Sequence, residues 1–98
     1  MNKVDQVIKD TVQDYYAQRK LPFPKSIQAL LFLVSEVGEI ADAEVDKMGD
    51  WVRNNERVRD EAEEVADVFF MLYVYAIAKG IDPMHEMLKK MRKKLNED

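Results

Sequence analysis

Residues 61–80 read EAEEVADVFFMLYVYAIAKG, a run in which acidic residues lead directly into a long apolar segment. Asp67 is the only charged residue between Val65 and Ala78. A helix that is apolar on every side has to be enclosed by other helices. The apolar part, 68–78, is too short to span a membrane. This segment therefore predicts the central helix of a globular all-α domain.

The acidic residues before this apolar segment repeat a pattern found earlier in the chain. EVGEIAD at 36–42 resembles EAEEVAD at 61–67. Helical residues three apart lie on one face, with their Cβ atoms roughly 5 to 6 Å from each other. The repeat supplies two such pairs: Glu36 with Glu39, and Glu64 with Asp67. Antiparallel helices could point the two pairs at each other, which predicts a site formed by four carboxylates.

Prolines and glycines divide the chain into four segments with apolar residues at helical spacing. These segments cover about 2–19, 26–47, 55–80 and 83–95. Their ends carry residues that favour caps and turns: Ser26, Asn55, Gly80, and Asp82 followed by Pro83. No stretch alternates with a period of two over the length of a strand. The expected fold is therefore an all-α, four-helix bundle-like domain.

Composition narrows the class of protein. The 98 residues, 47% hydrophobic and 35% charged, describe one domain over 1–98. A net charge of -4 and a pI near 5.0 argue against non-specific nucleic-acid binding, which needs a cationic face. The absence of cysteine excludes disulfides, thiol nucleophiles and Cys-based zinc sites. The polar N-terminus lacks the apolar core of a signal peptide, so we expect a cytoplasmic protein without a membrane partner.

The central helix also predicts a homo-oligomer. Three other helices are too few to enclose it completely, so we expect a second copy to complete the bundle, as a dimer or a tetramer. Small domains gain from association because their own cores are modest. Gly38 supports close packing, since a mid-helix glycine costs about 1 kcal/mol relative to alanine. It projects away from Glu36, toward a neighbouring helix rather than a ligand.

Four carboxylates without a histidine or sulfur partner favour Mg²⁺, with Mn²⁺ as a substitute, because these ions prefer oxygen ligands. A di-iron centre would need a Glu-x-x-His motif on each of two helices, and the chain has one histidine, His85. Asp67 is followed one turn later by Phe70 and Met71, and a buried carboxylate must be neutralised by a proton, an ion pair or a metal. One structural alternative stays open, in which cations of the fourth helix form buried salt bridges with these groups.

The residues around the quartet also carry a family resemblance. The stretches concerned are LVSEVGEIA at 33–41, EEVADV at 63–68 and GID at 80–82. They resemble the MazG-like all-α nucleoside triphosphate pyrophosphohydrolases over about residues 20–95. The signature of that family is E-x-x-E on one helix and E-x-x-D on the next. It fits Glu36, Glu39, Glu64 and Asp67.

This resemblance implies a metal-dependent hydrolase. The four carboxylates would hold Mg²⁺, and the protein would split a ribo- or deoxyribonucleoside triphosphate into the monophosphate and pyrophosphate, which would serve house-cleaning of the nucleotide pool. Either Glu36 or Glu39 would act as the general base. Asp42 and Glu61, the unmatched ends of the repeat, would be secondary or structural.

Other residues are candidates for holding the substrate. Lysines suit a triphosphate as compact point charges, and the fourth helix offers Lys90, Lys93 and Lys94, which are equally well explained as a solvated face. Trp51, between the two acidic helices, could stack on a nucleobase or cover the end of the bundle core. Two further classes of function stay open: a non-catalytic helical interaction module, and a nucleotide or metal sensor without turnover.

Overall fold

The structure is a computed structural model that describes residues 3–47 and 61–97. Four helices lie in these ranges: α1 (Lys3–Gln18), α2 (Ser26–Lys47), α3 (Glu61–Lys79) and α4 (Pro83–Leu95). The two ranges contain no strand, so the predicted all-α class is confirmed. Asn55, the predicted cap of the third helix, lies outside the described residues. None of the described helices is long and apolar enough to cross a membrane.

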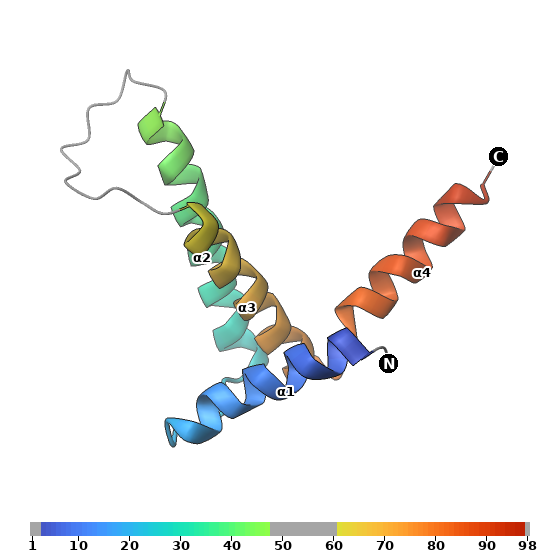
Figure 1. Ribbon diagram of the computed structural model, residues 1–98. Coiled ribbons are helices and arrows are strands. Elements are labelled where there is room, and N and C mark those ends of the chain that lie inside the picture. Colours follow the sequence, from blue (N-terminus) through green and yellow to red (C-terminus); the bar gives the residue numbers. More distant parts are fainter. Residues whose placement is uncertain (1–2, 48–60, 98) are drawn as a thin grey trace.

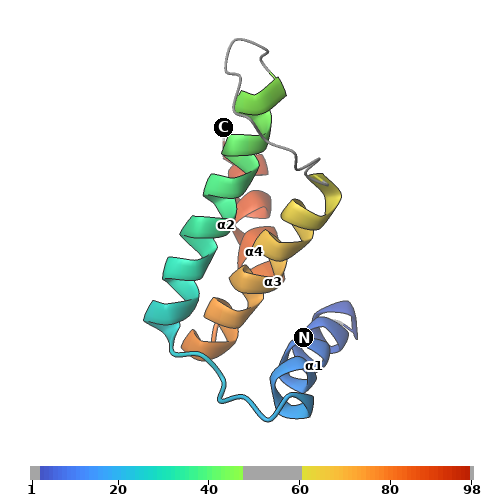
Figure 2. The same ribbon diagram turned by 90° about the vertical axis from the view of Figure 1, so that its left-hand side faces the viewer.

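The helices are arranged around one antiparallel pair (Figure 1). α2 and α3 run side by side in opposite directions, and α1 packs against the end of the pair where α2 begins and α3 ends (Figures 1 and 2). α4 leads away from the pair (Figure 1). The core lies where α1 meets the pair, and its buried members are Val12, Ala29, Met71, Tyr73 and Val74. Ala29 of α2 and Val74 of α3 are both 0% exposed, and both belong to this core.

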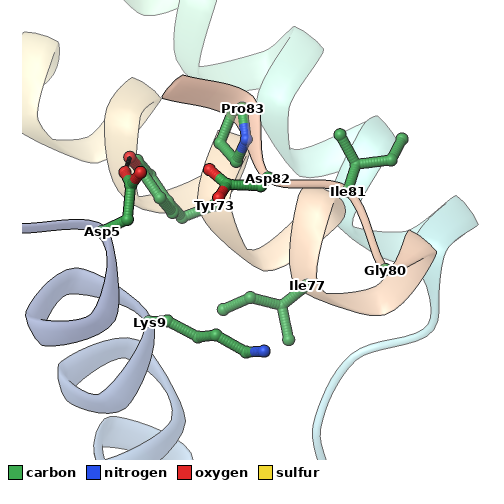
Figure 3. Close-up of a pocket in the computed structure, with 8 residues that line it drawn as sticks. All are labelled: Asp5, Lys9, Tyr73, Ile77, Gly80, Ile81, Asp82 and Pro83. Atoms are coloured by element: carbon green, nitrogen blue, oxygen red, sulfur yellow. Dashed lines mark hydrogen bonds between the residues drawn. The ribbon is translucent and has the colours of Figure 1, made fainter. Parts of the chain in front are cut away.

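A buried hydrogen bond fastens the start of α1 to α3 (Figure 3). The Tyr73 hydroxyl donates to Asp5 Oδ1 at 3.1 Å, and the two side chains are 7% and 4% exposed. Burial raises the pKa of Tyr73 above its usual value, and the hydrogen bond to Asp5 raises it further. The hydroxyl therefore keeps the proton that it donates. The sequence pattern did not predict this contact. Nothing in the sequence distinguishes Asp5 from Asp10 and Asp14, the other aspartates of α1, and these two are exposed.

The turn between α3 and α4 follows the predicted end signals. Gly80 has a φ of +69°, and the Ile81 N–H donates to the Ala76 carbonyl at 2.8 Å. This is a Schellman ending, which favours glycine because an L side chain is strained at positive φ. The Asp82 side chain then accepts a hydrogen bond from the His85 N–H at 3.3 Å and caps α4.

The start of α2 differs from the prediction. Ser26 is the first residue of the helix rather than the residue that caps it. The Lys25 N–H instead donates to Gln28 Oε1 at 3.0 Å, which is the glutamine half of a capping box. Serine is a common capping residue, but the position of the first helical turn is set by the whole segment, and here it places glutamine at the capping distance.

Within the described residues, the bundle stays open. α4 does not close it, and the apolar stripe of α4 remains on the surface, with Met87 54% and Leu95 83% exposed. α3 is incompletely enclosed as well, since Val65 and Phe69 are 44% and 59% exposed. A Cβ added at Gly38 would meet none of the described atoms within 4 Å. The close neighbour predicted at Gly38 is therefore not part of the described chain.

The end of α1 holds backbone strain that one substitution should relieve. The Leu21 N–H donates to the Tyr16 carbonyl at 3.0 Å, as at the end of α3, but the residue with positive φ is Lys20, at 54°. This conformation costs an L-residue roughly 1 to 2 kcal/mol, whereas glycine adopts it readily. We expect Lys20→Gly to stabilise the fold by about 0.5 to 1 kcal/mol, a rise in Tm of several degrees, in a melt followed by circular dichroism.

Gly80→Ala is the matched control for this substitution. The added Cβ meets no described atom within 4 Å, so backbone strain alone opposes it, and the Tm should fall by a similar amount. An unchanged or lowered Tm for Lys20→Gly would show that Lys20 is not strained.

Candidate metal centre and active site

α2 and α3 bring carboxylates of the two acidic motifs together. Glu36, Glu64 and Asp67 each offer one carboxylate oxygen, and these oxygens all lie within 4.8 Å of one another. Glu36 belongs to the middle of α2, while Glu64 and Asp67 lie one turn apart in the first half of α3. The antiparallel pairing therefore makes residues of the two motifs face each other across the helix pair.

The remaining member of the predicted quartet, Glu39, lies beside Glu36 and shares a side-chain hydrogen bond with it. Burial raises the pKa of the Glu36 carboxyl above its usual value. The negative charges of Glu39 and Asp67 and the hydrogen bond with Glu39 raise it further. Each of these effects disfavours the charged form of Glu36. A cation bound beside it would reverse that preference.

Burial within this cluster differs from the prediction for Asp67. Its side chain is exposed, because the core lies further along α3, around Met71 and Val74. Glu36 and Glu64 are the carboxylates that are partly buried instead. The Oε2 atom of each is buried, and that of Glu36 has no hydrogen-bond partner among the described residues. A buried carboxylate oxygen without a partner is unfavourable, so the anomaly expected at Asp67 occurs at Glu36.

The three clustered residues fit a divalent ion that prefers oxygen ligands. Two oxygens on opposite sides of a six-coordinate Mg²⁺ lie about 4.2 Å apart. Oxygens within 4.8 Å of one another could therefore surround the ion after a small closing movement. The cluster contains carboxylates alone, which favours Mg²⁺ or Mn²⁺ over ions that select nitrogen or sulfur. The buried Oε2 of Glu36 would gain a partner from such an ion.

An open hollow of about 360 Å³ adjoins the cluster and shares Glu36 and Asp67 with it. The rest of its lining is apolar or aromatic: Tyr15, Tyr16, Leu21, Pro24, Phe32, Phe70 and Met71. We call it the aromatic hollow. The sequence pattern does not predict this hollow. A sequence signal for the hollow was nevertheless present, because Phe32 lies one turn before Glu36 and Phe70 lies one turn after Asp67.

Several predicted site residues do not join the cluster. Lys90, Lys93 and Lys94 are exposed on α4, which leads away from the α2–α3 pair (Figure 1). This divergence also keeps these lysines away from the carboxylates of the cluster. Within one chain, they therefore do not form the buried salt bridges of the structural alternative. Trp51 lies outside the described residues. Asp42 and Glu61 are not among the three clustered residues.

The fold and the cluster together define a class of protein. An all-α domain whose E-x-x-E and E-x-x-D motifs face each other on an antiparallel pair is of the MazG-like pyrophosphohydrolase type. The model of the phosphoribosyl-ATP pyrophosphohydrolase family matches residues 1–95. The chain therefore belongs to this family, and the resemblance seen in its motifs is confirmed. No curated protein and no solved structure matches the chain.

Removing the charge of Glu36 should stabilise the metal-free protein. Glu36→Gln keeps the size of the side chain and ends the repulsion from Glu39 and Asp67. In EDTA we expect the free energy of unfolding, measured in urea, to rise by about 1 kcal/mol. Mg²⁺ at one hundred times its Kd should stabilise the wild type by about 2.7 kcal/mol and the variant by much less.

Glu44→Gln is the matched control, since Glu44 is an exposed carboxylate elsewhere on α2. It should leave the stability in EDTA and the effect of Mg²⁺ within about 0.5 kcal/mol of the wild type. A large loss of stability for Glu36→Gln in EDTA would reveal a cationic partner of Glu36 and contradict the metal site.

Proposed function

We propose that the protein is a Mg²⁺-dependent pyrophosphohydrolase that cleaves a nucleoside triphosphate into the nucleoside monophosphate and pyrophosphate, with Mn²⁺ as a substitute ion. The observation that carries this proposal is the convergence of Glu36, Glu64 and Asp67 within 4.8 Å, in a chain of a pyrophosphohydrolase family. A triphosphate adds negative charge to an acidic site, so it needs cations in order to bind there. When bound, Mg²⁺ would stabilise charge on the phosphoryl oxygens and lower the pKa of a water molecule.

Different carboxylates of the site suit different roles. Glu36, Glu64 and Asp67 are the three that cluster and would hold the metal. Glu39 adjoins them through its hydrogen bond with Glu36, and we assign it the role of general base. Its carboxylate accepts a proton from the attacking water as the new oxygen–phosphorus bond forms. The bond between the α and β phosphates breaks, its electron pair stays on the departing phosphate oxygen, and Glu39 later returns its proton to solvent.

Two substrate classes are compatible with a family named after phosphoribosyl-ATP. One is a simple nucleoside triphosphate, and the other carries an additional phosphoribosyl group on the base. The additional phosphate of the second class needs a cation of its own. None of the described residues that line the aromatic hollow is a lysine or an arginine, and the Arg19 guanidinium is engaged with the ring of Tyr15, which favours the simple triphosphates. Their turnover in the cytoplasm would serve the house-cleaning of the nucleotide pool.

The direct test is to incubate the pure protein and Mg²⁺ with each common ribo- and deoxyribonucleoside triphosphate, and with phosphoribosyl-ATP, and to measure pyrophosphate and monophosphate. We expect both products from simple triphosphates. Glu39→Gln should lower kcat by about 10²-fold or more while Mg²⁺ still raises the Tm. Glu64→Gln should lose both activity and the Mg²⁺ effect.

The other outcomes of this assay would indicate a different substrate or a different class of function. Turnover of phosphoribosyl-ATP alone would keep the reaction and correct the substrate. Thermal protection by Mg²⁺ and nucleotide without product would identify a sensor and overturn the proposal of an enzyme. Neither protection nor product would favour a helical interaction module.

We also propose that the protein forms a homo-oligomer in which a second copy covers one face of α2. This face is an uncharged stripe of exposed residues at helical spacing: Ile27, Leu30, Leu31, Val34, Gly38 and Ala41. Contiguous exposed apolar surface usually marks an interface. Two copies can meet along the stripe without repulsion between like charges, and Gly38 lacks the Cβ that would hold the helices apart. Since Glu36 points to the opposite side of α2, such an interface leaves the carboxylates accessible.

Val34→Lys tests this interface because it places a charge in the middle of the stripe. Light scattering should give at least twice the single-chain mass of 11.5 kDa for the wild type and the single-chain mass for the variant. Ser35→Lys adds the same charge at the next position, which is exposed and lies off the stripe, and it should keep the oligomer. A monomeric wild type would contradict the interface without affecting the proposed activity.

A further inference from the structure

The aromatic hollow lies one helical turn from the carboxylate cluster. On α2, Phe32 precedes Glu36 by four residues, and on α3, Phe70 follows Asp67 by three. Because the two helices are antiparallel (Figure 1), both rings are displaced from the carboxylates toward the same end of the pair. One helical turn is about 5.4 Å along the axis. If a triphosphate is held at the carboxylates, these rings therefore lie about where its nucleoside would be.

Most rings of the hollow are already packed against one another. Tyr15 meets Tyr16 and Phe70 edge to face, at 5.1 and 4.9 Å between ring centroids. Tyr16 lies against Phe70 in a stacked arrangement at 6.0 Å. The Arg19 guanidinium covers one face of Tyr15, 3.8 Å from its centroid. These contacts hold the rings that α1 and α3 contribute in place, although Tyr15 remains 40% exposed.

Phe32 is the exception among the aromatic residues of the hollow. It comes from α2, takes part in none of these ring contacts, and is 58% exposed. An exposed phenylalanine costs apolar hydration, and this one lines a hollow in which the rings of Tyr15, Tyr16 and Phe70 contact one another. A flat ligand could lie in the hollow with one face on the Phe32 ring.

We propose that the aromatic hollow is the nucleobase subsite and that Phe32 is the ring on which the base stacks. This inference rests on the proposed function in one respect, because it takes the triphosphate to be held at the carboxylates. The lining offers no side-chain amide and no cation to read the edge of a base. Recognition therefore comes from stacking, which favours the larger purine rings over pyrimidines and separates adenine from guanine weakly.

The test measures binding by calorimetry in Mg²⁺, with two probes. The α,β-methylene analogue of ATP carries a base and cannot be cleaved at the proposed bond, while inorganic tripolyphosphate has no base. Phe32→Ala should weaken binding of the ATP analogue by roughly 5- to 100-fold and change binding of tripolyphosphate by less than about twofold. Phe32→Trp, which restores a ring, should bind the ATP analogue at least as tightly as the wild type.

Phe69→Ala is the matched control. Phe69 is 59% exposed, as Phe32 is 58% exposed, but it does not line the hollow, so its removal should leave both affinities unchanged. In the wild type, the adenine analogue should bind more tightly than the corresponding cytosine analogue, and Phe32→Ala should remove most of that difference.

Two results would overturn the subsite. One is wild-type affinity of Phe32→Ala for the ATP analogue, and the other is an equal loss of affinity for tripolyphosphate. Either result leaves the proposed hydrolysis untouched, since that is measured by product formation. Conversely, binding that depends on Phe32 in a protein that forms no pyrophosphate supports the subsite and overturns the proposed activity. A wild type that binds neither probe refutes the subsite.

Discussion

The antiparallel packing of α2 on α3 is the contact on which the rest of the structure depends. It brings Glu36 of one helix within 4.8 Å of Glu64 and Asp67 of the other, although like charges repel at that distance. Apolar burial has to outweigh this repulsion, and it does so where Ala29 and Val74 are fully buried. A close helix contact at one place thus holds together carboxylates that would otherwise separate.

The stabilising core and the carboxylate cluster occupy different parts of the same helix pair. The core gathers where α1 joins the pair, whereas Glu64 and Asp67 lie toward the start of α3. This separation leaves the carboxylates open to a large charged substrate. Glu36 belongs to the carboxylate cluster but is partly buried, and its pKa is raised by burial first and by its acidic neighbours second.

α1 connects the two regions. Near its start, the Asp5–Tyr73 hydrogen bond ties it to the second half of α3. Near its end, Tyr15 and Tyr16 pack on Phe70, one turn from Asp67. With two attachments along its length, α1 supplies one wall of the aromatic hollow. The exposed apolar faces of α2 and α4, by contrast, have no counterpart among the described residues, and they are the surfaces that association would bury.

The sequence by itself determined the features that depend on a few neighbouring residues. Helical periodicity placed the four helices, Gly80 and Asp82 marked a real end and a real start, and the one-turn spacing of Glu64 and Asp67 put both on one face. Tertiary structure alone decided that Asp5 is buried, that Asp67 is exposed while Glu36 and Glu64 hold buried oxygens, that α4 carries its lysines away, and that Phe32 lines a hollow. The physical reason is range: capping and periodicity act within one or two helical turns, whereas burial depends on how whole helices lie against one another.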